Sequence, residues 1–259
     1  MPEIKIALNI MRIMKNWPVS FAEYFGLYRI LKKNHIQYIL RNGIKYEIRT
    51  ETSDRAIFHE IWVRKYYNPK GFIIKEDDLV IDIGAHIGIF AVFAAQFAKN
   101  GKIYAFEPMP ENFEMLRNNI GINKSTNIIS VNKAVSDKKG EKELYLSKDN
   151  TGEHSFIFNE DKSKKVKVKT ISLKDIIDEY NLTKINFLKI DCEGAEYEIL
   201  LNSPQDIFHK IEKISMECHY IDKTRNIFSL KKYLEEQGFD VTIRENFPML
   251  YAKNKFISE

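Results

Sequence analysis

Short apolar runs alternate with segments of helical periodicity over most of this chain. Apolar runs that end in a polar residue indicate buried strands, whereas apolar residues repeated every three or four positions indicate helices. Strands are predicted at 79–82, 102–106, 127–132, 187–191, 214–219, 239–244 and 249–253. Helices are predicted at 90–98, 111–121, 173–180 and 226–237, and a further helix begins at Glu196, where a negative charge suits a helix N-terminus. This alternation predicts an α/β fold around a seven-stranded, mostly parallel sheet, and the last two strands predict a terminal antiparallel hairpin.

The first 70 residues have a different pattern and are expected to form an N-terminal appendage. Apolar residues at helical spacing predict helices in 1–35 with a break at Trp17-Pro18, and the alternation in Gln37–Arg49 around an Asn-Gly pair predicts a hairpin. A helix is predicted over Asp54–Tyr67. The helical arm is expected to pack on the main domain or on a second subunit, which allows a homodimer. Its Lys and Arg residues leave a membrane-surface helix as an alternative.

Residues 71–259 are expected to form the main domain, and its strand–helix rhythm breaks once, between about 141 and 170. Glu143–Leu146 and Lys165–Lys169 have the pattern of two strands, and the polar residues between them predict an inserted hairpin with a long tip. Long loops often cover a site, so His154 in this tip is a candidate on the substrate side. A solvent-exposed loop histidine is the simpler interpretation.

The first group of candidate site residues lies in the segment D-I-G-A-H-I-G-I-F, which begins at Asp82, the last residue of the first predicted strand of the main domain. Gly84 permits a sharp turn off the strand, and Gly88 permits the helix start to lie close to the strand or to a ligand. Asp82 ends the first strand and Glu107 follows the second, so both are expected at the sheet edge where open α/β sheets bind ligands. A carboxylate in the position of Glu107 can accept hydrogen bonds from both hydroxyls of a ribose.

This turn favours a nucleoside ligand without a phosphate. A dinucleotide site needs G-x-G-x-x-G, whereas the spacing here is G-x-x-x-G, with His86 where a glycine would stand. Asp82 would repel a pyrophosphate but suits a ligand with an ammonium group, such as S-adenosylmethionine. A strand–turn–helix unit whose glycines serve only packing is the simpler alternative, but it leaves two acidic strand ends unexplained.

Five segments together resemble the FkbM-type family of S-adenosylmethionine-dependent methyltransferases. They are D-I-G-A-H-I-G-I-F, F-E-P, N-K-A-V-S-D, L-K-I-D-C-E-G-A-E and E-C-H, and K-I-D-x-E-G-A-E is the most specific piece. The match covers roughly residues 54–219. The resemblance implies a Rossmann-like class I methyltransferase fold, S-adenosylmethionine as cofactor, and methylation of a hydroxyl on a sugar, a glycan or a secondary metabolite.

The resemblance also assigns positions to individual residues. It implies that Lys133, Ala134 and Val135 wall the adenine, and that the region of Asp54 and Glu60 lies near the cofactor. For these two residues, a helix cap and a solvated helix face are simpler interpretations. The cofactor-binding residues are therefore expected to be Asp82, Gly84, Ala85, His86, Gly88, Glu107, Pro108, Ala134 and Asp191.

Further polar residues end the fourth and fifth strands of the main domain. Asp191 and Glu193 follow the fourth strand, and Glu217 and His219 end the fifth, so all four are expected at the same edge as Asp82. The ordinary pKa of histidine makes His219 the candidate general base for an alcohol, with Asp191 or Glu193 to orient it or a substrate hydroxyl. The same groups can hold a divalent cation, but no metal site is predicted.

Composition argues against several other classes. There are 40 Lys and Arg and 36 Asp and Glu, so a net charge of +4 does not point to nucleic-acid binding, although the first 70 residues hold 13 basic and 6 acidic residues. Cys192 and Cys218 lack a C-x-x-C partner, which argues against zinc, and two thiols suggest a reducing compartment. Without a long apolar run or a recognisable secretory signal, a cytoplasmic protein with no integral membrane segment is expected.

Two other functions stay open. An NAD-dependent oxidoreductase is disfavoured by the missing third glycine and by Asp82. A non-catalytic, methyltransferase-like binding module is disfavoured by the intact acidic strand ends. The sequence therefore predicts an S-adenosylmethionine-dependent O-methyltransferase whose acceptor is the hydroxyl of a small molecule or a glycan.

Overall fold

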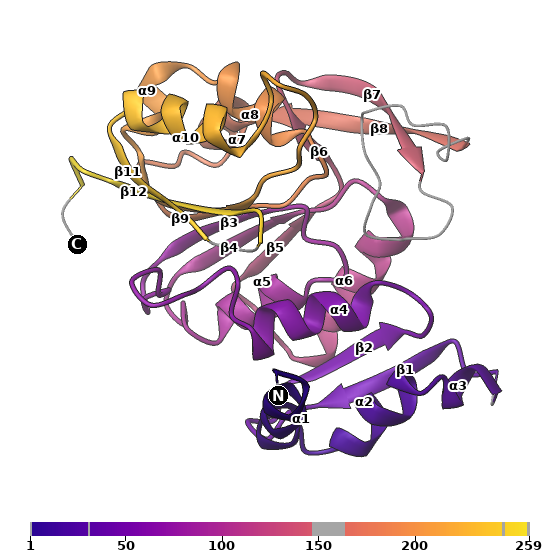
Figure 1. The fold of residues 1–259 in the computed structure, drawn as a ribbon. Coiled ribbons are helices and arrows are strands. Elements are labelled where there is room, and N and C mark those ends of the chain that lie inside the picture. The colour runs from indigo at the N-terminus through magenta and orange to yellow at the C-terminus, as the bar shows by residue number, and fades with distance from the viewer. Residues whose placement is uncertain (1, 31, 147–163, 245–246, 258–259) are drawn as a thin grey trace.

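The computed structural model describes residues 2–30, 32–146, 164–244 and 247–257. Its central element is a seven-stranded sheet in the order β11-β12-β10-β9-β3-β4-β5 (Figure 1). The strands are β3 Leu79–Ile83, β4 Lys102–Phe106, β5 Ile128–Val131, β9 Ile185–Ile190, β10 Ile211–Glu217, β11 Phe239–Ile243 and β12 Met249–Asn254. Neighbouring strands from β10 to β5 are parallel, whereas β12 is antiparallel to both β10 and β11. The predicted fold class and the terminal antiparallel hairpin are therefore confirmed.

Helices cover both faces of this sheet. On one face lie α5 Ile89–Ala95 and α6 Pro110–Ile122, and on the other α7 Leu173–Glu179, α8 Glu196–Leu201, α9 Gln205–Phe208 and α10 Ile227–Glu236 (Figure 1). Successive side chains of a strand point to opposite faces, so Val80 joins the apolar cluster that includes α5, and Ile81 joins the cluster that includes α7 to α10. Burial on both faces requires an unbroken apolar run, which is why the strands were recognisable. The four-residue α9 was not predicted, because one turn shows no periodicity.

An N-terminal module packs against the face that carries α5. It consists of α1 Pro2–Ile13, α2 Trp17–Tyr24, α3 Leu27–Ile30, the hairpin β1 His35–Ile39 and β2 Lys45–Arg49, α4 Asp54–Phe58 and the π-helix η1 His59–Val63. The hairpin and the break between α1 and α2 agree with the sequence pattern, but the last helical segment ends at Val63 and not at Tyr67. Phe58 of this module and Phe90 of the main domain belong to one apolar cluster, so the module shares its core with the sheet.

A second sheet of three strands contains the two predicted strands of the insertion. β7 Gly140–Leu146 and β8 Lys164–Ser172 pair antiparallel over both predicted strands and extend beyond them. β6 Ala134–Ser136 lies parallel to β8 and was not predicted, because three residues are too few for a strand pattern. His154 falls outside the described residues. In the described part of the chain, no helix has the length and apolar character needed to cross a membrane.

Candidate active site

The turn after β3 depends on its two glycines. Gly84 has a φ of +72°, and a Cβ at this position would collide with the backbone carbonyl oxygen of Asp191, so the ends of β3 and β9 approach closely only around a glycine. Gly88 has a φ of +84°, and a Cβ there would lie 2.5 Å from Leu116 Cδ1 of α6. Gly88 therefore allows the turn to approach α6, a neighbour that the sequence did not indicate.

An open cavity lies at the carboxyl edge of the sheet, between the strand ends and the α4–η1 segment. Its volume, including the open space at its mouth, is about 1060 Å³. The predicted site residues that line it are Gly84, His86, Glu107, Pro108, Ala134, Asp191 and Glu193. Asp82, Ala85, Gly88 and His219 are not among its lining residues.

Glu107 supports the turn and also lines the cavity. Its Oε2 accepts a hydrogen bond from His86 N–H at 2.8 Å, and its Oε1 accepts one from Met109 N–H at 2.9 Å. Burial raises the pKa of Glu107 to about 7, although the two backbone N–H groups oppose the rise. The Asn112 side chain is a third hydrogen-bond partner, and a carboxylate has about four acceptor sites, so Glu107 can still accept a hydrogen bond from a hydroxyl of a ligand.

Asp82 is fully buried and already has a cationic partner. Lys189 Nζ of β9 lies 3.1 Å from Asp82 Oδ1 and 3.8 Å from Asp191 Oδ2, and it donates a hydrogen bond to Gly84 O at 2.7 Å. Burial lowers the pKa of Lys189, but Asp82 and Asp191 outweigh this effect and leave that pKa above its ordinary value. The expectation that Asp82 meets the ammonium of a ligand does not fit this arrangement, because the ammonium of Lys189 occupies that position. The ion pair instead joins the ends of β3 and β9.

Two glutamates hold His219 just beyond β10. Its Nδ1 lies 3.1 Å from Glu196 Oε1, its Nε2 lies 3.4 Å from Glu193 Oε2, and its backbone N–H donates to Glu196 Oε1 at 2.6 Å. Burial lowers the pKa of His219, but the hydrogen bond and charge of Glu196, with the charges of Glu193 and Asp191, outweigh it and raise the pKa to about 10. A histidine with this pKa keeps its proton at neutral pH, which disfavours His219 as the general base that its ordinary pKa suggested.

The same three groups have the composition of a metal site. Asp191, Glu193 and His219 can each bring one ligand atom within 4.8 Å of the others. A divalent cation would have to displace the proton from His219 Nε2, since metals bind neutral imidazole. Ion pairing with the two glutamates already explains how the histidine is held.

A second polar group lines the cavity beside Tyr67. The Tyr67 hydroxyl donates to Asp191 Oδ2 at 2.8 Å and lies 3.3 Å from Glu217 Oε2. Burial, reinforced by neighbouring carboxylates, raises the pKa of both Glu60 and Glu217 to about 7. Glu60 lines the cavity, so its interpretation as part of a solvated helix face is wrong. Its position on the π-helix fits the frequent occurrence of such turns at functional sites.

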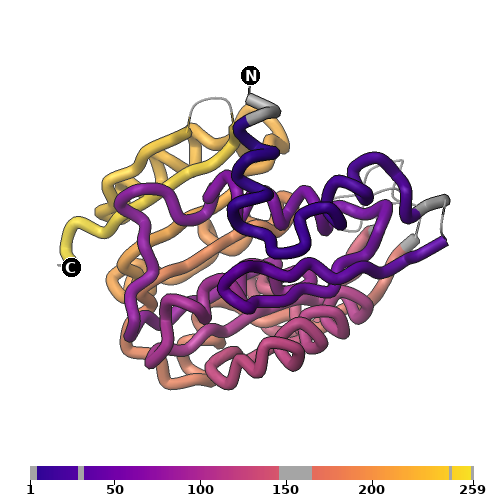
Figure 2. Tube along the Cα trace, turned by 90° about the horizontal axis from the view of Figure 1, so that it is seen from below, coloured from indigo at the N-terminus to yellow at the C-terminus, as the bar shows by residue number. Residues whose placement is uncertain are grey.

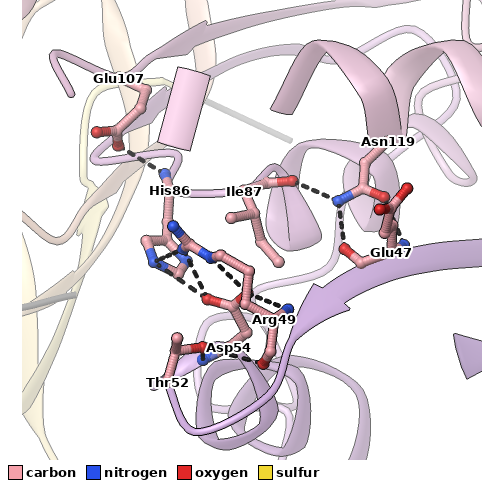
Figure 3. A network of polar contacts seen from close by, with 8 residues as sticks. All are labelled: Glu47, Arg49, Thr52, Asp54, His86, Ile87, Glu107 and Asn119. Carbon is pink, nitrogen blue, oxygen red and sulfur yellow. Dashed lines mark hydrogen bonds and ion pairs between the residues drawn. The ribbon is translucent and has the colours of Figure 1, made fainter. Parts of the chain in front are cut away.

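Figure 3 shows how the N-terminal module fastens the glycine turn. His86 Nε2 lies 3.2 Å from Arg49 Nη2 and 3.5 Å from Asp54 Oδ1, and Arg49 Nη2 lies 2.9 Å from the same Asp54 oxygen. Burial lowers the pKa of His86 to about 4, so the ring is neutral, and its Nε2 accepts from the guanidinium, which can only donate. Asp54 is fully buried, and Ser53 is the N-cap residue, so the helix-cap interpretation of Asp54 is wrong.

Hydrogen bonds of an α6 side chain also connect the N-terminal module to the glycine turn (Figure 3). The Asn119 side chain donates to Ile87 O at 2.9 Å and to Glu47 O at 3.1 Å, and Glu47 N–H donates to Asn119 Oδ1 at 2.8 Å. The hairpin of the N-terminal module is therefore joined to both α6 and the glycine turn. It contributes to the shape of the site although it lies far from the turn in sequence.

The profile of the Methyltransferase FkbM domain matches residues 82–241, which is more than half of the chain and includes the glycine turn, Glu107 and the segment from Asp191 to His219. The chain belongs to the FkbM methyltransferase family. One solved structure, the methyltransferase FkbM from Methylobacillus flagellatus KT, has a TM-score of 0.51 at 16% identity and covers 96% of this chain and 58% of that chain. At this identity the likeness shows the fold alone.

Several curated proteins are similar in sequence to this FkbM-family chain. The AMB antimetabolite synthetase AmbE of Pseudomonas aeruginosa is 25% identical over 73% of the chain, but the chain spans only 11% of that protein. The 31-O-demethyl-FK506 methyltransferase FkbM of Streptomyces tacrolimicus is 25% identical over 73% of the chain and 83% of that protein. The hexuronic acid methyltransferase AglP of Haloferax volcanii is 29% identical over 66% of the chain and 73% of that protein.

Sequence reasoning missed three residues that organise this FkbM-family site, Lys189, Glu196 and Tyr67. A usable signal existed for Lys189, which interrupts the apolar run I-N-F-L-K-I, because a lysine in a buried strand needs an anionic partner. Glu196 was expected only to suit the start of α8, yet it is fully buried and fixes His219. Tyr67 gave no signal, since a tyrosine at the end of a predicted helix is most simply a packing residue.

Proposed function

We propose that this chain transfers the methyl group of S-adenosylmethionine to a hydroxyl of an uncharged polar acceptor, such as a sugar, a glycan or a secondary metabolite. The observation that carries the proposal is one cavity whose lining joins the glycine turn and Glu107 to the carboxylates of Asp191, Glu193 and Glu217. The printed name of one relative supports this chemistry, since it is a 31-O-demethyl-FK506 methyltransferase.

The residues around the glycine turn fit the cofactor. Glu107 has an acceptor site left for a ribose hydroxyl, and the small Ala134 leaves room for a flat ring beside Val135 and Leu144. Among the described residues that line the cavity there is no lysine or arginine, so a phosphate group would find no cation. When bound, S-adenosylmethionine supplies an activated methyl group, and the protein has to orient the acceptor and receive one proton.

The carboxylates indicate the chemistry of the acceptor. Glu60, Asp191, Glu193 and Glu217 all line the cavity, so an anionic acceptor would be repelled, whereas a hydroxyl can donate a hydrogen bond to them. Glu217 is our candidate for the proton acceptor, because its pKa of about 7 lies close to neutral pH. Asp191 and Glu193 orient the hydroxyl, and His219 positions Glu193.

The cofactor part of the proposal is tested by calorimetric titration with S-adenosylmethionine, S-adenosylhomocysteine and NAD. We expect the wild-type protein to bind the first two and not NAD. Glu107→Gln should bind them at least about tenfold more weakly, because the loss of one acceptor oxygen removes a hydrogen bond of a charged group worth about 1.5–3 kcal/mol. The exposed Glu111→Gln is the matched control and should bind normally. A wild-type protein that binds neither adenosyl compound contradicts the proposal.

The acceptor part is tested by transfer of a labelled methyl group to neutral sugars and polyols, with uronic acids and amino sugars for comparison. Glu217→Gln should lower kcat by about a hundredfold or more while the affinity for S-adenosylhomocysteine is unchanged, since general-base catalysis contributes at least that much. The exposed Glu236→Gln serves as the control. Methyl transfer to nitrogen or carbon only, or a normal kcat for Glu217→Gln, would refute this part.

A further inference from the structure

Helices α1 to α3 leave large apolar side chains exposed at one end of the molecule. Leu8, Trp17, Tyr24, Phe25 and Leu27 are five of the eleven large apolar side chains that are exposed in the described part of the chain. Tyr24 and Phe25 are 63% and 75% exposed, and their rings meet edge to face with centroids 5.3 Å apart. Figure 2, which views this end of the molecule, shows α1 and α2 in front of the rest of the chain. Such a concentration of exposed apolar side chains marks an interaction surface.

The exposed charges on the same segment are basic. Between residues 5 and 33, the exposed charged side chains that the structure describes are Lys5, Arg12, Lys15, Lys32 and Lys33. Lys5 and Arg12 lie on the same face of α1 as Leu8, because positions three and four apart share a helix face. The acidic side chain of Glu23 is only 7% exposed and pairs with Arg55 Nε at 2.5 Å. These five basic and five apolar side chains are termed the N-terminal amphipathic surface.

The other faces of these helices are already used for packing within the chain. Ile10 and Met14 of the α1 segment are buried in the apolar cluster that includes α5, and Ser20 of α2 is buried against the hydroxyl of Tyr38. The N-terminal amphipathic surface is therefore what remains outside after the module has folded onto the sheet. Its exposed apolar residues therefore do not contribute to the described core of the chain.

This combination of side chains fits an anionic lipid surface. Aromatic and leucine side chains partition into the boundary between headgroups and acyl chains, and each nearby Lys or Arg adds about 1 kcal/mol of attraction to anionic lipid. A second copy of the chain fits less well, because a two-fold interface would bring basic residues onto basic residues without an exposed acidic side chain among those described. We propose that the N-terminal amphipathic surface binds peripherally to anionic phospholipid bilayers. This inference does not depend on the proposed methyl transfer.

The test is flotation of the full chain with vesicles of phosphatidylcholine alone and of phosphatidylcholine mixed equally with phosphatidylglycerol. We expect the wild-type protein to float with the mixed vesicles, less so at high salt, and not with phosphatidylcholine alone. The double variants Tyr24→Ser/Phe25→Ser and Lys32→Glu/Lys33→Glu should each bind at least about tenfold more weakly, because each removes two of the interacting side chains.

Matched controls lie elsewhere on the surface. Phe228→Ser removes an equally exposed aromatic side chain, and Lys99→Glu/Lys102→Glu makes the same change in net charge, so both should bind as the wild type does. Unchanged thermal unfolding would show that all variants are folded. Absence of wild-type binding, or an equal loss in the controls, would overturn the proposal. The proposal would also be overturned if binding needed the lysines but not the aromatic pair and the protein bound heparin equally well. A dimer in solution that dissociates in the Tyr24→Ser/Phe25→Ser variant would overturn it too.

Discussion

Replacing Lys189 by methionine tests whether its ion pair with Asp82 holds the ends of β3 and β9 together. Both side chains are almost completely buried, and the Nζ–Oδ1 distance is 3.1 Å. At an effective dielectric constant of about 20, Coulomb's law gives a pair at this distance about 5 kcal/mol. Removing one partner of a buried pair typically costs about 3–5 kcal/mol, because an uncompensated charge stays in the interior. We therefore expect Lys189→Met to lower the free energy of unfolding by about 3–5 kcal/mol at pH 7.

The loss should depend on pH. Burial already raises the pKa of Asp82, and Lys189 opposes that rise, so the pKa climbs further in Lys189→Met. A folded-state pKa above the unfolded value favours folding at low pH, and this advantage is lost as the pH rises through the folded pKa. The variant should therefore be closer to the wild type at pH 5 than at pH 8.

Urea unfolding followed by circular dichroism and tryptophan fluorescence measures these differences, and a double-mutant cycle with Asp82→Asn isolates the pair. The double variant should lose less stability than the sum of the single variants, with a coupling of at least about 2 kcal/mol. Lys174→Met, which breaks an exposed pair with Asp178, is the control and should cost less than about 1 kcal/mol. A loss below about 1 kcal/mol for Lys189→Met, together with additive single variants, would refute the reasoning.

Two further predictions concern the glycine turn and the buried histidine. Gly88→Ala should lower the melting temperature by several degrees, because its φ of +84° is strained for alanine and its Cβ meets α6. Gly121→Ala, where a Cβ meets nothing within 4 Å, is the control and should raise the melting temperature slightly. If calorimetry showed the same decrease in melting temperature for both variants, this prediction would be contradicted. In Glu196→Gln, the pKa of His219 should fall from about 10 towards its ordinary value near 6.5, as an NMR titration can show. Because the folded-state pKa of His219 lies above the unfolded value, its protonation stabilises the fold fully below about pH 6.5, and this stabilisation is lost as the pH rises towards 10. The stability deficit of the variant should therefore be larger at pH 6 than at pH 10. An unchanged histidine pKa would refute that role of Glu196.

The sequence by itself determined the fold and part of the cavity lining. Strands buried on both faces need unbroken apolar runs, and helices packed on a sheet need apolar residues every three or four positions, so both leave a local record. The carboxyl ends of parallel strands meet at one edge, which is why Glu107, Asp191 and Glu193 were predicted together and line one cavity. These inferences required only local patterns and the direction of the strands.

Only the tertiary structure decided which charges face each other. Asp82 meets Lys189 across two neighbouring strands, and His219 meets Glu196 from the start of another helix. These partners are far apart or on different elements, and a periodic pattern carries no information about which side chains come into contact. The pKa of a buried group depends on such partners and on its distance from water, so the proton on His219 and the neutral ring of His86 follow from packing and not from residue type.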